Sequence, residues 1–386
     1  MKILHVISSM NPHGGGPVES VRQLGAALFA SGHRVEIASL DSPVALFLRQ
    51  SALPIHALGP AHSGYAYSKR FARWMCANRG RYDAVIINGL WQYHSFGTWR
   101  ALRHSDTPYV VYPHGMLDPW FKKQFPLKHL KKWMYWPWAE YRVLRDAQAV
   151  LFTCEEERCL ARESFWLYRC NEVVVSYGTS KPGGDPDFEL MEFFTRHPEL
   201  IGKKLVLFIG RIHPKKGCDL LIEAFAKVLG AQPDWHLVMA GPDQVGWREK
   251  LSARANELGM GSRVTWTGML GGATKWGALR AAEIFVLPSH QENFGIAVAE
   301  ALAASVPVLI SNKVNIWREI ECDQAGIVSE DTLDGTCQLL ESYAGLSTEK
   351  KRAMRGAAVS CFERRFEITK AAQTLHAVLS GATGAI

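Results

Sequence analysis

The amino-acid sequence predicts an α/β protein with two domains, each built on a mainly parallel sheet. At 386 residues the chain is too long for one ordinary domain and fits two of about 180–190 residues. Short apolar segments alternate with amphipathic segments in both halves, which is typical of parallel strands joined by helices. The alternation stops once, in the turn-rich stretch from Gly178 to Asp187, which we interpret as a linker or lid.

In the first half, six apolar segments predict strands, with helices between several of them. The helix expected at Val18–Ala30 is the clearest, because Val21, Leu24 and Leu28 share one face. The expected strands are Ile3–Ile7, Val35–Ser39, Ala84–Asn88, Tyr109–Tyr112, Ala149–Thr153 and Val173–Ser176.

The second half repeats the pattern and ends in a stretch, Thr348–Leu379, that we expect to be purely helical. Its expected strands are Leu205–Ile209, His236–Met239, Val264–Thr267, Ile284–Leu287 and Val308–Ile310.

Composition excludes several classes of protein. Hydrophobic content of 47% and charged content of 21% are typical of a soluble globular chain. No apolar run reaches the roughly 18 residues of a membrane span, and the N-terminal run is too short for a signal peptide, so we expect a cytoplasmic location. Eight cysteines without Cys-x-x-Cys spacing argue against a zinc site or redox motif. The net charge of +7 is compatible with nucleic acid, a membrane surface or small anions.

The segment from Leu287 to Glu300 is the most informative part of the chain. A strand leads into a loop, and a helix begins at about Phe294–Gly295. Unpaired N–H groups at a helix start suit phosphate oxygens, so we expect Asn293, Phe294 and Gly295 to form a phosphate-binding loop. Glu292 precedes those N–H groups and can accept hydrogen bonds from the hydroxyls of a sugar. Glu300, further along the helix, can accept hydrogen bonds from a second hydroxyl-rich group such as ribose. Acids also occur near helix starts for capping alone.

Two other loops follow predicted strands. Three glycines, Gly14 to Gly16, precede a helix and let a ligand approach the backbone, although a plain turn would also use them. They do not form Gly-x-Gly-x-x-Gly, which disfavours a nicotinamide dinucleotide. In the second half, Arg211 offers a bidentate fork and Lys216 a point charge, a suitable pair for a diphosphate. The neighbouring Lys215 is less favoured, and a solvated basic loop is the alternative.

His114 lies just past a strand end, where ligand clefts form in α/β proteins, and Gly115 permits a tight turn behind it. A lone histidine is often structural, so this role stays open from the residues alone. Asp118 is a nearby candidate for contacts with a second substrate.

The segment from Trp120 to Arg145 contains seven Lys or Arg residues and a single acid, Glu140, with tryptophans interleaved among them. Indoles and cations suit a membrane surface, where each cation contributes on the order of 1 kcal/mol. A solvated basic edge is the alternative. The residues expected on the acceptor or membrane side are Lys122, Lys123, Lys131, Lys132 and Trp133, with Asp118.

Taken together, these motifs resemble the retaining glycosyltransferases of family 4, which have the two-domain GT-B fold. The resemblance is carried by the glycine loop, His114, the Gly-Arg…Lys-Gly element and the Glu292-x7-Glu300 spacing. It implies two Rossmann-like domains, residues 1–180 and 181–365, facing each other across a cleft, and a terminal helix, 366–386, that packs back on the first domain. It also implies a donor-facing glycine loop with Gly15 and Gly16, and catalytic roles for His114, Arg211, Lys216 and Glu292. Family members commonly have Pro-Asn-Gly-Val/Ile-Asp at the end of the first domain, whereas this chain has Ser176-Tyr-Gly-Thr179 there. The resemblance therefore does not carry over any contact made by that Asn or Asp.

The expected function is therefore retaining transfer of a hexose from a UDP- or GDP-linked sugar to a glycan acceptor. We expect a lipid-linked acceptor, a pathway of cell-surface polysaccharide synthesis, and peripheral association with the inner face of the cytoplasmic membrane. No cofactor or metal is expected, because the nucleotide-sugar is a co-substrate, and nucleic acid is not an expected partner. The alternatives are a nucleotide-sugar 2-epimerase of the same fold and a basic, non-catalytic module for membranes or nucleic acid.

Overall fold

The computed structural model of the protein describes residues 1–61 and 63–381, apart from the side chains of Gln50 and Lys123. The chain divides into two compact units: unit 1 is Met1–Gly178 together with the C-terminal segment from Ile368, and unit 2 is Thr179–Glu367. The divisions expected after residues 180 and 365 lie close to these.

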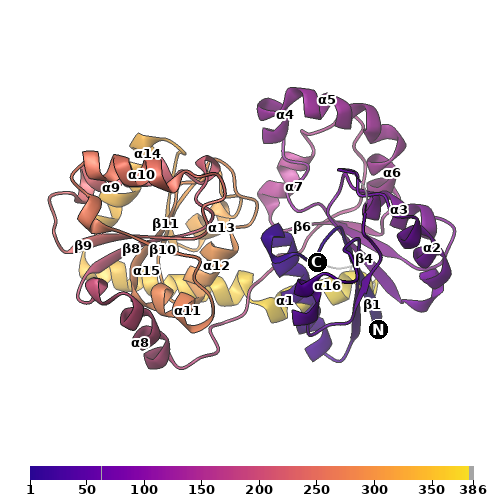
Figure 1. Cartoon of the computed structure of the whole chain (residues 1–386), viewed down its shortest axis with the longest axis horizontal. Coiled ribbons are helices and arrows are strands. Elements are labelled where there is room, and N and C mark those ends of the chain that lie inside the picture. The colour runs from indigo at the N-terminus through magenta and orange to yellow at the C-terminus, as the bar shows by residue number, and fades with distance from the viewer. Residues whose placement is uncertain (62, 382–386) are drawn as a thin grey trace. The chain divides into compact units, whose positions relative to one another are not determined.

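Within its described residues, unit 1 has a seven-stranded parallel sheet in the order β3-β2-β1-β4-β5-β6-β7. Figure 1 labels β1, β4 and β6 of this sheet. The sequence missed β3, which is short and half-buried, and placed β7 too late. The strands are β1 Lys2–Ile7, β2 Arg34–Ser39, β3 Ile55–Ala57, β4 Ala84–Asn88, β5 Tyr109–Tyr112, β6 Ala149–Phe152 and β7 Glu172–Val174. The α-helices are α1 Gly16–Ala30, α2 Lys69–Asn78, α3 Tyr93–Leu102, α4 Trp120–Gln124, α5 Pro126–Tyr135, α6 Glu140–Arg145, α7 Glu155–Ala161 and α16 Ile368–Leu379.

Unit 2, as described, has a six-stranded parallel sheet in the order β10-β9-β8-β11-β12-β13. The strands are β8 Lys204–Ile209, β9 Trp235–Ala240, β10 Val264–Gly268, β11 Ala282–Leu287, β12 Val308–Ser311 and β13 Gly326–Ser329, the last of which the sequence missed. The helices are α8 Pro186–Arg196, α9 Cys218–Leu229, α10 Arg248–Glu257, α11 Gly272–Ala281, α12 Ile296–Ala303, α13 Trp317–Cys322, α14 Leu333–Ala344 and α15 Thr348–Cys361. Two parallel sheets with helical connections confirm the predicted α/β class.

The two sheets place their loops in the same way. Central strands such as β4 are buried along their whole length, because helices cover both faces of a parallel sheet. The strand order reverses between β1 and β4 in unit 1 and between β8 and β11 in unit 2. At such a reversal the loops leaving the two strands diverge, which opens a crevice at the carboxyl edge of the sheet. The glycine loop follows β1, and the loops with Arg211 and Glu292 follow β8 and β11.

The turn-rich stretch from Gly178 to Asp187 is only partly a linker. Helix α8 begins at Pro186, and the Asp185 side chain accepts a hydrogen bond from the Asp187 N–H at 2.9 Å. An aspartate cap followed by proline is a favoured helix start, so the Asp-Pro-Asp pattern serves the fold of unit 2.

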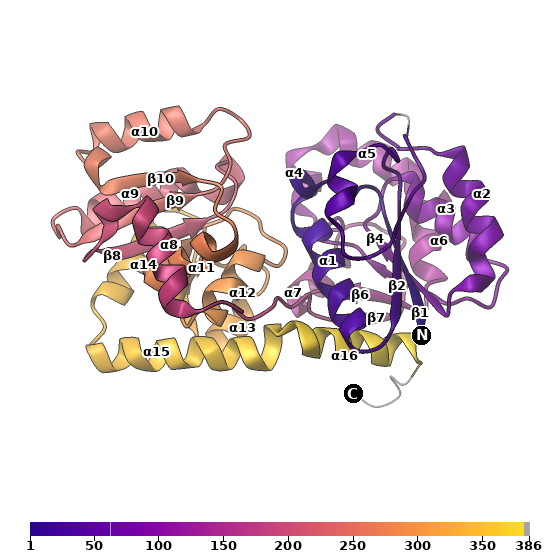
Figure 2. The same ribbon diagram turned by 60° about the horizontal axis from the view of Figure 1, so that its bottom comes forward.

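The C-terminal stretch is helical but interrupted. A π-helical turn, Phe362–Phe366, follows α15, and the extended Glu367 separates it from α16. The backbone N–H of Thr179 donates to the Phe366 carbonyl at 2.8 Å, so the two chain segments at the unit boundary lie side by side. In unit 1, α16 packs beside α1 (Figure 2), where His376 stacks on His33 with ring centroids 4.6 Å apart.

Candidate functional site

The loop after β8 presents a row of cations. It runs from Gly210 through Arg211 into a 3-10 turn, Pro214–Lys216, which the His213 side chain caps by accepting from the Lys215 N–H at 3.1 Å. Gly217 ends the turn with a φ of 65°, and a Cβ there would lie 2.2 Å from the Pro288 carbonyl oxygen. Glycine therefore lets the β8 and β11 loops pack directly against each other.

The loop after β11 holds Glu292 in a fixed position. The Glu292 N–H donates to the Lys313 carbonyl at 2.9 Å, and the Glu292 carbonyl accepts from the Asn315 N–H at 3.0 Å. Helix α12 begins at Ile296 after Gly295, whose φ is 75°, slightly later than the sequence predicted. The support from the loop after β12 was not predicted, because nothing in that segment's sequence indicates its partner.

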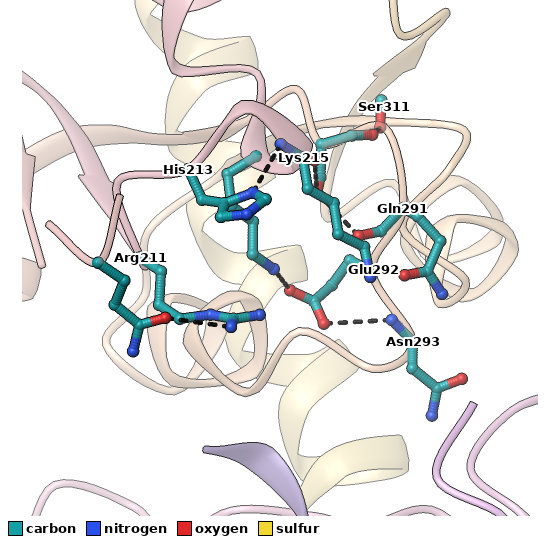
Figure 3. A network of polar contacts seen from close by, with 10 residues as sticks. Arg211, His213, Lys215, Gln291, Glu292, Asn293 and Ser311 are labelled. Carbon is teal, nitrogen blue, oxygen red and sulfur yellow. Dashed lines mark hydrogen bonds and ion pairs between the residues drawn. The ribbon is translucent and has the colours of Figure 1, made fainter. Parts of the chain in front are cut away.

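Lys216 and Glu292 form an ion pair at the centre of this site (Figure 3). The Lys216 side chain is 9% exposed and that of Glu292 is 23% exposed. The other Glu292 oxygen accepts from the Asn293 N–H at 3.1 Å. Burial alone would raise the pKa of Glu292, but the charges of Lys216, Lys215 and Arg211 outweigh it and lower the pKa.

Arg211 is exposed, and its guanidinium points toward Glu292 in Figure 3. Its Nη1 donates to the Gln244 side-chain oxygen at 3.3 Å. The structure thus brings together Arg211, Lys216, Glu292 and Asn293, all predicted as donor-binding residues. Three cations from one loop surround a single carboxylate, so the site has positive charge in excess and is suited to an anion.

Glu300 lies further along α12 and is already paired. Its carboxylate is buried and accepts from Lys275 Nζ at 2.6 Å, while the same ammonium lies 5.1 Å from the Trp276 ring centroid. Lys275 comes from α11, and sequence reasoning missed it because no pattern links that helix to α12. A ribose at Glu300 would therefore meet an ion pair rather than an isolated carboxylate.

In unit 1, the glycine loop after β1 is exposed. Gly15 caps α1 with φ 71° and ψ −136°, and Gly16 is the first helical residue. A Cβ at either position would meet nothing within 4 Å, so packing does not require these glycines, although the positive φ favours glycine at position 15. A pocket of about 180 Å³ adjoins the loop and is lined by Met10, Gly15 and Arg22, among others.

His114 occupies a strained turn after β5. Its φ is 55°, its ring stacks on Tyr112 with centroids 5.7 Å apart, and both ring nitrogens are shielded without a hydrogen-bond partner in the described chain. Burial, with smaller effects of His94 and His5, lowers the pKa of His114 to about 3, so the ring is neutral at physiological pH. Such strain and unpaired polar groups are typical of functional sites.

Glu157 fixes that turn, which the sequence did not predict. Its carboxylate, from α7, accepts from the Gly115 N–H at 2.6 Å and from the backbone and hydroxyl of Thr153 at 2.8 and 2.6 Å. Asp118, expected to contact an acceptor, is buried and accepts from the Trp120 N–H at 2.8 Å, so its carboxylate closes a turn.

The basic, tryptophan-rich segment divides into buried and exposed parts. Lys122 and Lys131 are exposed, as is Trp133, whereas the side chain of Lys123 lies outside the described residues. Lys132, expected on the membrane side, instead lies over the Trp91 ring at 4.5 Å. Trp136 is fully buried, so it belongs to the core of unit 1 and cannot contact a membrane.

Over the described residues, no group of three or more His, Cys, Asp or Glu side chains is arranged to hold a metal ion. In the same part of the chain, no helix combines the length and apolar character needed to cross a membrane.

Two family models match the chain. The model described as a glycosyl transferase 4-like domain matches residues 15–178, and that of glycosyl transferases group 1 matches residues 192–337. The chain is 24% identical over 374 residues to the GDP-mannose-dependent alpha-(1-6)-phosphatidylinositol dimannoside mannosyltransferase of Mycobacterium tuberculosis, covering 95% of this chain and 92% of that protein. A more local match, 34% identical over 125 residues, is to an uncharacterized glycosyltransferase of Methanocaldococcus jannaschii and spans 32% of this chain and 31% of that protein.

The solved structures give the same fold. HepE of Anabaena in complex with UDP aligns over 99% of this chain and 100% of its own, with a TM-score of 0.79 and 18% identity. At that identity the likeness establishes the fold, two Rossmann-like domains of the GT-B type. With both family models matched along most of the chain, the protein belongs to the group 1 glycosyl transferases of family 4 and is a glycosyltransferase.

Proposed function

We propose that this enzyme transfers a hexose, with retention of configuration, from a UDP- or GDP-linked sugar to a glycan acceptor. The observation that carries the proposal is the Lys216–Glu292 ion pair with Arg211 beside it, at the strand-order reversal of unit 2. The cations suit a diphosphate, and the carboxylate suits sugar hydroxyls. Helices α9 and α12 begin in the same two loops, and their first N–H groups favour negative charge.

In the proposed mechanism, the donor separates Lys216 from Glu292. The diphosphate forms ion pairs with Lys216 and Arg211, and hydroxyls of the hexose donate hydrogen bonds to Glu292. As the bond between the anomeric carbon and the diphosphate oxygen breaks, the charge that develops on the leaving phosphate is stabilised by the two cations. The acceptor hydroxyl bonds to the anomeric carbon on the same face and gives its proton to the leaving phosphate oxygen, so configuration is retained.

Residues outside this ion pair have supporting roles in the proposal. His114 is neutral and has unpaired ring nitrogens, so it can hydrogen-bond a sugar hydroxyl without acting as a charged acid. Glu300, with Lys275, would hold the ribose. Gly15 and Gly16 would let the diphosphate or the acceptor approach the backbone.

The names of similar proteins support both donor bases. The mycobacterial relative is named as GDP-mannose-dependent, and structures of HepE are described in complex with UDP and with UDP-glucose. A thermal-shift panel of UDP, GDP, UDP-glucose and GDP-mannose would identify the base, since a ligand that binds the folded state raises the melting temperature. We expect one base to give the larger shift, and Arg211→Ala to abolish it.

Transfer itself is tested by release of nucleotide diphosphate with and without a glycan acceptor. Release that requires the acceptor supports a transferase, whereas a sugar isomerised without one would identify an epimerase. Wild-type transfer rates in both Arg211→Ala and Glu292→Ala would contradict the proposed site.

We also propose that the acceptor is lipid-linked, in a pathway of cell-surface polysaccharide synthesis, and that the enzyme binds the membrane peripherally. On α5, Leu127 and Met134 are 78% and 60% exposed beside several lysines, a composition suited to an anionic bilayer surface. Flotation with anionic vesicles should be lost in the double variant Leu127→Gln/Met134→Gln. It should be retained in Leu46→Gln, which changes a similarly exposed leucine elsewhere in unit 1.

A further inference from the structure

Unit 1 contains a second, larger pocket, of about 710 Å³, between α5 and the segment Arg162–Trp166 that follows α7. Its walls are mainly apolar and aromatic. His129 stacks on Phe165 with ring centroids 4.8 Å apart, and Trp133 and Trp166 lie 6.0 Å apart. Leu130 also lines the pocket. The volume and lining are typical of a small-molecule site, and none of these residues takes part in the proposed donor site.

The charges around the pocket favour an anionic ligand. Lys122 is exposed on its rim, and the segment Pro119–Ala139, which supplies α4 and α5, contains five lysines and no acid. On the opposite wall, Arg162 is held by an ion pair with Glu172, and Glu163 is the acid in the lining. The side formed by α4 and α5 is therefore the cationic side, and an anionic group would lie against Lys122 of α4.

Helix α5, which supplies one wall of the pocket, also carries exposed apolar side chains. Leu127 and Met134 on α5 are exposed but do not line the pocket, and Leu130, between them in sequence, is 55% exposed at its wall. A ligand that arrives from water does not require an apolar approach of this kind, whereas one that arrives from a bilayer does.

We propose that this pocket binds the part of the acceptor's hydrocarbon chain nearest its head group, with the phosphate of the lipid against Lys122. The ligand class is a single-chain lipid phosphate or diphosphate. The inference rests on the proposed lipid-linked acceptor and adds to it a specific binding site away from the donor loops of unit 2.

The test uses farnesyl phosphate, a soluble lipid phosphate, and follows its binding to the whole protein by tryptophan fluorescence. Leu130→Trp should fill the pocket and weaken binding about tenfold or more, since buried hydrocarbon area sets the affinity. Leu46→Trp, the same change at an exposed leucine of unit 1 away from the pocket and from α5, should leave binding unchanged. Trp166→Ala, a second pocket variant at an exposed position, should also weaken binding.

The head group is tested separately. Lys122→Gln should weaken farnesyl phosphate binding but leave the weaker binding of farnesol unchanged, and inorganic phosphate alone should not compete. Equal binding by Leu130→Trp and Leu46→Trp would overturn the pocket. Binding only to phosphatidylglycerol vesicles, with none to farnesyl phosphate, would mean general membrane adhesion and would overturn it as well.

Donor binding, measured by thermal shift on the same variants, separates this inference from the proposed function. A wild-type protein that binds nucleotide but not farnesyl phosphate contradicts the pocket alone. A protein that binds farnesyl phosphate but no nucleotide contradicts the donor site alone.

Discussion

Lys215 and Lys216 are adjacent in sequence but lie in different surroundings. The Lys216 ammonium is buried against Glu292, whereas the Lys215 carbonyl accepts hydrogen bonds from the Ser289 hydroxyl and the His290 N–H. Lys216 therefore contributes its charge to the site, and Lys215 contributes chiefly its backbone to the packing of the two loops. Sequence reasoning favoured Lys216 over its neighbour, and the ion pair gives a physical reason for that preference.

We expect Lys216→Ala to lower kcat/KM by about a hundredfold, because it removes the buried positive charge that would stabilise the leaving phosphate. Lys215→Ala, a matched change one residue away, should lower kcat/KM by less than about tenfold. Steady-state kinetics with the identified donor measure both. Equal losses would mean that the loop's net charge acts as a whole and that the ion pair has no special role.

Glu157 is a second residue for which the structure leads us to predict an effect on catalysis. It accepts the Gly115 N–H and so holds the turn in which His114 adopts a positive φ. In Glu157→Gln, a side-chain NH2 group would replace the oxygen that accepts from Thr153. That NH2 group would then face the N–H and O–H donors of Thr153, and these buried groups would lose their hydrogen bonds. We expect kcat to fall about tenfold to a hundredfold because His114 moves, while the dissociation constant of the nucleotide diphosphate, which lacks the sugar, stays unchanged.

The control for that prediction is Glu155→Gln, an exposed carboxylate of the same helix that pairs only with Arg158 among the described salt bridges. It should leave kcat unchanged. A Glu157→Gln variant that folds and keeps wild-type kcat would show that the turn does not need its anchor.

At the scale of elements, strand–loop–helix units were predictable and their partners were not. The unit from β11 to α12 follows from an apolar run, a proline and a glycine that are local in sequence. Glu300 and Lys275 are 25 positions apart, and Gly115 and Glu157 are 42 apart. Local periodicity contains no information on such pairs, so sequence found the loops of the site but missed the residues that hold them. Short elements such as β3 were missed for a related reason, because three residues show no period.

The terminal helix gives a prediction at this scale. In α16, Leu375 is fully buried, and the Gln148 side chain donates to the Val378 carbonyl at 2.8 Å, so the helix is part of the core of unit 1. Leu375→Ala should destabilise that unit by about 2–5 kcal/mol, the usual range for a core leucine. Gln373→Ala, an exposed position on the same helix, should change stability by less than about 0.5 kcal/mol. Urea unfolding measures both, and equal midpoints would mean that α16 contributes little to the core.

At the scale of the whole molecule, buried titratable groups in unit 1 make stability depend on pH. Burial lowers the pKa of His5 and His94 to about 4 and that of His114 to about 3, from an ordinary value of 6.5. Burial also raises the pKa of Glu140 to about 7 from 4.5, although Ser95, Trp91 and Lys132 oppose that effect. Between pH 6.5 and 4.5 the unfolded chain therefore binds protons on three histidines that the folded chain does not. In the same window the folded chain binds one proton on Glu140 that the unfolded chain does not.

The balance is two protons in favour of the unfolded state, so stability must fall as the pH is lowered through this window. These four groups alone give a slope of up to about 3 kcal/mol per pH unit, since each proton contributes about 1.4 kcal/mol per unit. The lowered pKa values of His33 and His129 act in the same direction and add to it. Glu140→Gln removes the one opposing group. At pH 8 the wild type carries an ionised, buried Glu140 that the variant lacks, so the variant should be at least as stable. The variant should then lose stability more steeply toward pH 5. Urea unfolding at pH 8, 6.5 and 5 checks both slopes. A wild-type stability that stays level from pH 6.5 to 5 would mean that the three histidines take up protons in the folded protein, and that His114 is not held neutral.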